Sequence, residues 1–158
     1  MGGFERISWD GNQEWFWTYS SDQYRSHHDI EPLPNGNILI IAWEYKNASQ
    51  AEDMGKVIGN TSSKTIGTAS VWPDKVLEIK PVGIDDAEIV WEWSFWDHTI
   101  QDIDNTKDNF GNISEHPELL DINFGYSGQD WMHCNGIDYN HMLDQIALSC
   151  KNTNEISI

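Results

Sequence analysis

The chain has little positive charge. Its 158 residues include 9 lysines and arginines against 26 aspartates and glutamates, which gives a formal net charge of −17. Nucleic acids and anionic membrane surfaces are bound through basic patches, so we expect neither as a partner. The acidic surface is first of all a source of solubility. If the substrate is an anion, its site must build positive potential locally, from histidine, lysine and backbone N–H groups.

Long apolar runs, helical periodicity and cysteine are also scarce. No apolar run is long enough to cross a bilayer, and helical patterns are limited to a short helix within residues 48–58 and a turn of helix at residues 117–121. The two cysteines, Cys134 and Cys150, flank a predicted turn. They would form a cross-strand disulfide in an oxidising compartment or stay as two buried thiols in a reducing one, and both readings remain open.

Aromatic residues, by contrast, are abundant, with nine tryptophans. Tryptophan suits packed, half-buried sheets. Trp15 and Trp17 alternate within a strand predicted over residues 13–20, so their side chains lie on one face. Similar strand patterns recur at residues 37–44, 76–80 and 88–95. We therefore predict an all-β fold.

Two hairpins whose first strand begins with histidine form an internal repeat. In the first, Asn35-Gly36 separates the strand that begins with His27 and His28 from an apolar strand, and Asn-Gly is the strongest short hairpin signal in a sequence. In the second, a strand that begins at His133 leads to a turn near residues 141–143. The repeat is about 105 residues long, counted from His28 to His133. Repeated β units of this kind predict a propeller or another radial array.

The order of the strands divides the chain into parts of a β-propeller with four-stranded antiparallel blades. A propeller needs about four blades or more to close, and this chain supplies about two. Either it closes in some other way or, as we expect, it is a fragment with about two blades of a six-bladed propeller. It forms one partial domain, residues 1–158. Within it we assign residues 13–20 to the last strand of one blade, 26–95 to a complete blade with a long insertion at 46–71, 96–130 to a long loop and 130–158 to an incomplete next blade.

The second hairpin gathers groups that suit an oxyanion. His133 and Asn135 are two apart on a predicted strand and so point the same way, and the turn brings Lys151 back opposite His133. The alternative is structural: Asn135 could cap a turn, and a histidine is often a satisfied structural residue. His27 precedes His28 and points to the opposite face, so we interpret it as structural.

Longer motifs resemble those of the bacterial arylsulfotransferases, also called aryl-sulfate sulfotransferases. The motifs follow one another in order from about Trp15 to Ile158, over nearly the whole chain. They are His27-His28-Asp29-Ile30-Glu31-Pro32-Leu33-Pro34-Asn35-Gly36-Asn37, Trp96-Asp97-His98, Glu115-His116-Pro117-Glu118-Leu119-Leu120-Asp121 and Asp130-Trp131-Met132-His133-Cys134-Asn135. The resemblance implies a β-propeller enzyme that moves a sulfuryl group from an aryl sulfate ester to a phenolic acceptor through a sulfohistidine.

Position by position, the resemblance implies catalytic roles for His28 and His133, with substrate contacts from Asn135, Lys151 and His98. The family usually has arginine where this chain has Lys151, and lysine offers one mobile charge in place of a planar fork. The family's nucleophilic histidine belongs to a later blade, and no histidine of this chain matches that motif. We therefore expect these residues alone to be inactive.

The resemblance also implies the partners and the location. They are a small aryl sulfate donor and a phenol acceptor, with no cofactor and no metal, in the periplasm or outside the cell, although the first residues lack the pattern of a signal peptide. A homodimer stays open. One rival is a noncatalytic propeller module that binds an aromatic or anionic ligand. The other is a metal-dependent hydrolase using His28, His98 and His133, which no His-x-x-x-His or Cys-x-x-Cys spacing supports.

Overall fold

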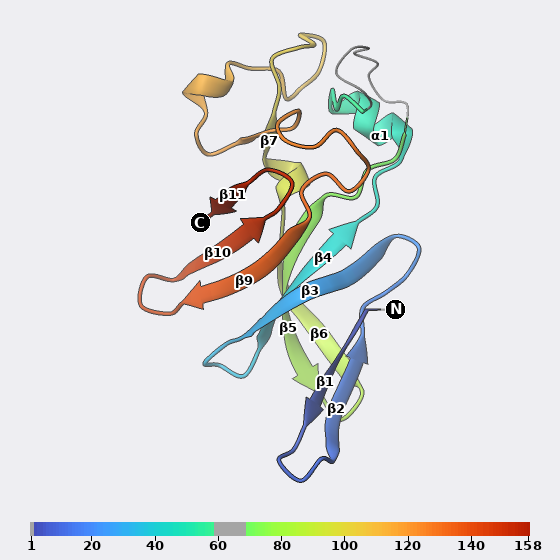
Figure 1. Ribbon diagram of the computed structural model, residues 1–158, viewed down its shortest axis with the longest axis vertical. Helices are drawn as coiled ribbons and strands as arrows, with labels where there is room; N and C mark the ends of the chain where they lie inside the picture. The colour runs from blue at the N-terminus through green and yellow to red at the C-terminus, as the bar shows by residue number, and fades with distance from the viewer. Residues whose placement is uncertain (1, 59–68) are drawn as a thin grey trace.

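The computed structural model describes residues 2–58 and 69–158, and the chain is mostly β, so the predicted all-β class is confirmed (Figure 1). Among these described residues, the single α-helix is α1 (Ala48–Asp53), and two short 3₁₀ helices cover Phe95–His98 and Ile113–Glu115. The strands are β1 (Gly3–Ile7), β2 (Gln13–Thr18), β3 (Tyr24–Pro32), β4 (Ile38–Glu44), β5 (Asp74–Val82), β6 (Asp86–Ser94), β7 (Thr99–Ile100), β8 (Leu120–Asp121), β9 (Cys134–Asn140), β10 (Gln145–Cys150) and β11 (Glu155–Ser157).

The largest sheet is an antiparallel meander in the order β3-β4-β5-β6. The predicted hairpin joins β3 to β4, and Gly36 in its turn has φ of 86°, a backbone conformation that glycine adopts without steric cost. The four strands are those predicted for residues 26–95. The predicted strand at residues 13–20 also forms, as β2, and pairs with β1, which the sequence pattern did not indicate.

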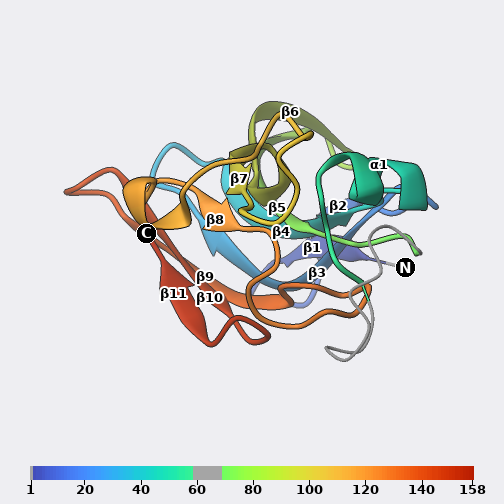
Figure 2. The same cartoon turned by 90° about the horizontal axis from the view of Figure 1, so that it is seen from above.

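A second antiparallel sheet has the order β11-β10-β9 and contains the second predicted hairpin. Its strand β9 lies beside β3 of the larger sheet, as Figures 1 and 2 both show. The contact includes a hydrogen bond from the Ile137 N–H to the Asp29 carboxylate, at 3.1 Å. The first strands of the two repeated hairpins, β3 and β9, are therefore neighbours in space.

The two faces of β4 explain its continuous apolar run. Leu39 and Ile41 point into one buried cluster, which also takes residues from β5, β9 and β10. Ile40 and Ala42 alternate with them and join a second cluster around Trp15 of β2. A strand buried on both faces is expected to read as unbroken hydrophobic sequence. This double burial fixes the register of the sheet, because a slip by one residue would exchange the two faces.

The connecting segments differ in part from the prediction. The helix expected within residues 48–58 is the shorter α1, capped by reciprocal hydrogen bonds between Asn47 and Gln50. The helical turn expected at residues 117–121 is wrong: Leu120–Asp121 is instead strand β8, paired in parallel with β7. Tertiary pairing satisfies this backbone, which overrides a weak local preference. Of the predicted insertion at 46–71, residues 59–68 lie outside the described residues.

Within residues 2–58 and 69–158, none of the helices has the length and apolar character needed to traverse a bilayer.

A lysine is buried where the long loop packs on the α1 segment. The Lys56 side chain is 1% exposed, and its ammonium donates a hydrogen bond to the Ile122 carbonyl at 2.6 Å. It also lies 4.4 Å from the centre of the Trp131 ring. Burial lowers the pKa of Lys56 from 10.5 to about 7, and the charge of Asp121 opposes this shift only in part. The folded state therefore favours the neutral amine.

This burial predicts that stability rises with pH above neutrality. The pKa of Lys56 is lower in the folded than in the unfolded chain, so between pH 7 and 10.5 the unfolded chain binds more protons. The free energy that folding loses by deprotonating Lys56 therefore decreases as pH rises across this window. The slope should reach about 1.4 kcal/mol per pH unit. Urea unfolding between pH 6 and pH 9 measures it, and Lys56→Met should flatten the curve. Equal slopes in the two proteins would contradict the assignment.

Candidate functional site

The rings of His28 and His133 meet where β3 lies against β9. Their centroids are 4.7 Å apart, and the planes cross at 70° in an edge-to-face contact. Residues 105 positions apart in the sequence are thus close enough to touch one small anion together. The two histidines to which the resemblance assigns catalytic roles are therefore in contact in the structure.

Both histidines have an uncommon backbone conformation. The φ angle is 59° at His28 and 53° at His133, in the left-handed region. His28 sits in an irregularity of the β3–β4 pairing between Ser26 and Ile30, and His133 directly precedes β9. Such a conformation costs a non-glycine residue about 1–3 kcal/mol and is concentrated at functional sites. The same departure at both repeats turns the two rings out of the normal strand alternation and toward each other.

His27 belongs to this cluster, so its placement on the opposite face was wrong. The left-handed turn at His28 brings the two neighbouring rings together, with their Nδ1 atoms 2.8 Å apart. The His27 side chain is 6% exposed and stacks on the Trp43 indole, with 4.0 Å between ring centres. Alternation along a strand fails here because it assumes extended φ at every residue.

A buried carboxylate anchors His27 from behind. Asp74 Oδ1 lies 2.7 Å from His27 Nε2, at an angle outside that of a regular hydrogen bond, so the pair is a close charge contact. The other oxygen of Asp74 accepts the Cys134 N–H at 3.1 Å. Burial raises the pKa of Asp74, and the contact with His27 opposes that shift. One carboxylate therefore ties the larger sheet to the residue that follows His133.

Hydrogen bonds to their Nδ1 atoms orient the imidazoles of His28 and His133. With the proton of His27 on Nε2, beside Asp74, the His27 Nδ1 atom accepts a hydrogen bond from the His28 Nδ1–H. His133 Nδ1 donates to the carboxylate of Asp130 in turn. The Nε2 atoms of His28 and His133 have no hydrogen-bond partner among the described residues, so each is free to meet a ligand.

The electrostatics of the pair favour a neutral His28 before a ligand binds. Removal from water lowers the pKa of His28, and the nearby His27 and His133 lower it further. An anion placed between the rings would reverse this, because negative charge favours the protonated imidazole.

Among the described residues, no recorded hydrogen bond, ion pair or ring contact joins the side chains of the three predicted substrate residues to the pair. His133 lies outside β9 with positive φ, so the alternation rule no longer aligns it with Asn135, which is exposed. The Lys151 backbone N–H donates to the His133 carbonyl as the register predicted, but its side chain is exposed. His98 stacks on Trp93 and bonds the Ser94 carbonyl, with no contact to the histidine pair within the described ranges.

Sequence reasoning missed the acidic partners. Asp130 stands three residues before His133, a spacing that could have marked it as an orienting group. Asp74 had no such local signal, because only the pairing of β4 with β5 brings it beside His27. The structure also forms the disulfide between Cys134 and Cys150, both fully buried, which resolves the open question about these cysteines.

A metal centre is not assembled from these side chains. His98 does not join the pair, so the three-imidazole set considered for zinc does not form. Across residues 2–58 and 69–158, no group of three or more histidine, cysteine, aspartate and glutamate side chains is arranged to hold a metal ion.

The role of Asp74 predicts a large loss of stability on its removal. Asp74→Ala leaves His27 and the Cys134 N–H buried without a partner, which should lower the free energy of unfolding by about 3 kcal/mol or more. Asp74→Asn keeps an acceptor for the amide and should cost less. Chemical denaturation measures both, with the exposed Asp138→Ala as the control. A loss in Asp74→Ala no larger than in that control would refute the anchoring role.

Comparison with known proteins agrees with the motifs. The family model described as Arylsulfotransferase (ASST) matches residues 11–157, which is most of the 158 residues. Searches among curated proteins and among solved structures give no match. The family match extends over both sheets and includes all the residues around the histidine pair, and on this ground the chain belongs to the arylsulfotransferase family.

Proposed function

We propose that this protein transfers a sulfuryl group from an aryl sulfate ester to a phenol through a sulfohistidine, and that His28 and His133 hold the sulfuryl group. The observation that carries the proposal is the contact of these two rings, 4.7 Å apart, with both Nε2 atoms free of protein partners. Two N–H donors directed at nonbridging oxygens stabilise the charge that the transition state spreads over them.

Local charge makes an anion site feasible in an acidic protein. The formal net charge is −17, so the overall field repels a sulfate ester. Protonation of His28 would place a positive charge at the contact itself. The charges of Asp74 and Asp130 raise the pKa of His28 in part, and the contact with Asp130 fixes the orientation of the His133 ring.

In this proposal the attacking histidine is neither of these two. No histidine of the chain stands in the motif that the family uses for its nucleophile, so His28 and His133 act as positioned donors. Covalent transfer in two steps splits one difficult displacement into two easier ones. Lys151 contributes positive charge near the site without a fixed contact, in keeping with its exposed side chain.

We further propose that the two sheets are consecutive propeller blades of an exported protein. The four-stranded meander, the repeated histidines and the side-by-side packing of β3 and β9 support the blades. The Cys134–Cys150 disulfide supports an oxidising location such as the periplasm.

The transfer reaction gives a direct test. In the protein that carries these residues, His133→Ala should lower phenol-dependent release of nitrophenolate from 4-nitrophenyl sulfate by at least about a hundredfold, since it removes one donor to the transferring group. His141→Ala, at the exposed tip of the same hairpin, is the matched control. A rate in His133→Ala within a few-fold of the control, or no turnover in the unmodified protein, would favour a noncatalytic binding module.

Binding of the anion should weaken as pH rises. Aryl sulfate binds the protonated form of His28, whose pKa lies below its ordinary value, so affinity should be highest at acidic pH and fall as pH rises through that pKa. The slope should approach about tenfold per pH unit for one linked proton. Calorimetric titration with phenyl sulfate on residues 1–158 measures it, and His28→Gln should remove most of the slope.

A further inference from the structure

A cavity between the turns of the two repeated hairpins lies apart from the histidine site. Both turns project to the same side of the molecule, as Figures 1 and 2 show. The cavity measures about 700 Å³, and small-molecule sites usually measure about 300–1,000 Å³. Its lining includes two aromatic residues, Trp91 and Tyr139, and two carboxylates, Glu78 and Asp144. None of the described residues that line it belongs to the histidine cluster.

Two cross-strand pairs, one from each sheet, place the aromatic rings at this cavity. In the larger sheet, Trp91 of β6 lies directly opposite Glu78 of β5. In the second sheet, Tyr139 of β9 lies directly opposite Ile146 of β10. Opposite residues of an antiparallel pair share a face, and all four of these residues line the cavity. The packing of one sheet on the other therefore builds it.

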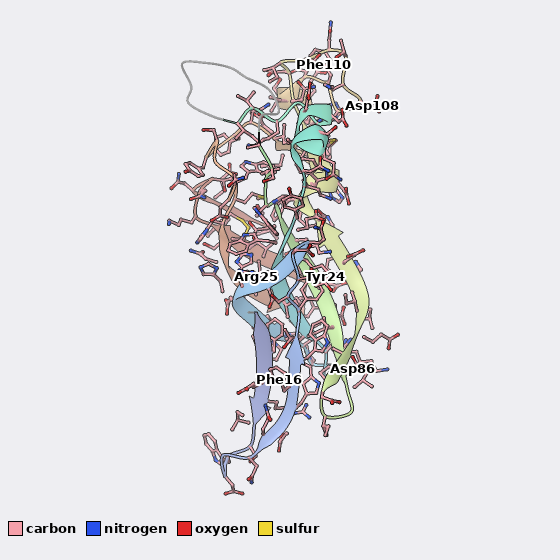
Figure 3. The ribbon with its side chains drawn as sticks, turned by 90° about the vertical axis from the view of Figure 1, so that its right-hand side faces the viewer. Phe16, Tyr24, Arg25, Asp86, Asp108 and Phe110 are labelled. Carbon is pink, nitrogen blue, oxygen red and sulfur yellow. A yellow bond between two sulfur atoms is a disulfide. The ribbon has the colours of Figure 1, made fainter. Side chains whose placement is uncertain are left out.

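The aromatic wall is accessible to a ligand. Trp91 lies on the edge strand of the larger sheet, which begins at Asp86 and whose side chains reach solvent (Figure 3, where Asp86 is labelled). Trp91 is 42% exposed, whereas tryptophan is highly buried on average. An indole face is the best side-chain partner for an organic cation in a cation–π contact, and a phenol ring is another.

Both carboxylates are held in place and keep an oxygen for a ligand. The side-chain amides of Asn35 and Asn37 donate to Glu78 Oε1. The Tyr139 hydroxyl donates to Asp144 Oδ1 at 2.7 Å. In the part of the chain that the structure describes, neither Glu78 Oε2 nor Asp144 Oδ2 accepts a hydrogen bond. Each of these two oxygens can therefore accept an N–H group from a ligand.

The charge of the cavity favours a positive ligand. The pKa of Tyr139 is raised, first by its hydrogen bond to Asp144 and also by the charges of Asp144 and Glu78, so both carboxylates act on the same ring. Among the described residues that line the cavity there is no lysine or arginine, and the formal net charge of the chain is −17. An anion such as a sulfate ester is repelled here, and a cation is attracted.

We propose that this cavity binds a small organic amine in its protonated form, with the ammonium group on the two carboxylates and the carbon atoms against Trp91 and Tyr139. The ammonium group has three N–H donors, which suits two carboxylate oxygens. Leu33, Pro34 and Ile146 complete an apolar wall for the carbon chain. A bare metal ion fits less well, because no group of three or more metal-binding side chains is assembled within residues 2–58 and 69–158.

Hexylamine tests the assignment without any sulfate ester. The protonated amine is titrated into ¹⁵N-labelled protein at pH 7, and the indole N–H signal of Trp91 is followed, with the fully exposed Trp9 as an internal reference. We expect a saturable shift at Trp91. 1-Hexanol has the same carbon chain without the charge, and hexanoate has the opposite charge. Both should bind at least about tenfold more weakly, because only the ammonium group gains from the rings and the carboxylates.

Variants separate this cavity from a general attraction to an acidic protein. Asp144→Asn removes one charge, keeps an acceptor for Tyr139 and tolerates the positive φ at this position, and it should weaken hexylamine by about threefold. Asp138→Asn removes the same charge from the opposite face of β9 and should leave the affinity nearly unchanged. No saturable shift at Trp91, equal affinity for hexylamine and 1-hexanol, or equal losses in the two variants would each overturn the assignment.

Discussion

The carboxylate of Asp74 is the interaction on which the rest of the site depends. It lies in the larger sheet with its side chain 1% exposed, and it binds His27 on one side and the Cys134 backbone on the other. Through His27 it fixes His28, and through Cys134 it fixes the residue that follows His133. A buried carboxylate without partners would be costly, so the two sheets must keep their relative position for the charge to stay satisfied.

Around that anchor, the chain combines rigidity with local strain. The Cys134–Cys150 disulfide closes the second hairpin next to His133, and the side chain of Asp29 bonds across from β3 to β9. These constraints hold two histidines in left-handed conformations that an isolated strand would not keep. The strain is what directs both rings to one point, which links the irregular backbone to the proposed binding of a sulfuryl group.

Charged and titratable groups surround the contact between His28 and His133. The surface is acidic overall, the histidines can gain protons, and carboxylates stand behind them. In the proposed function, the imidazoles of His28 and His133 hold the anionic ester.

The sequence by itself determined the all-β class, the two hairpins and the equivalence of His28 and His133. These follow from side-chain alternation and from the Asn35-Gly36 turn, which are properties of neighbouring residues. The motifs also determined the family. Only the tertiary structure decided that His27 joins the site, that His98 stacks on Trp93 instead, and that Asp74 supports the site. Those outcomes depend on positive φ at two residues and on contacts between strands far apart in the chain, and neither leaves a pattern in the local sequence.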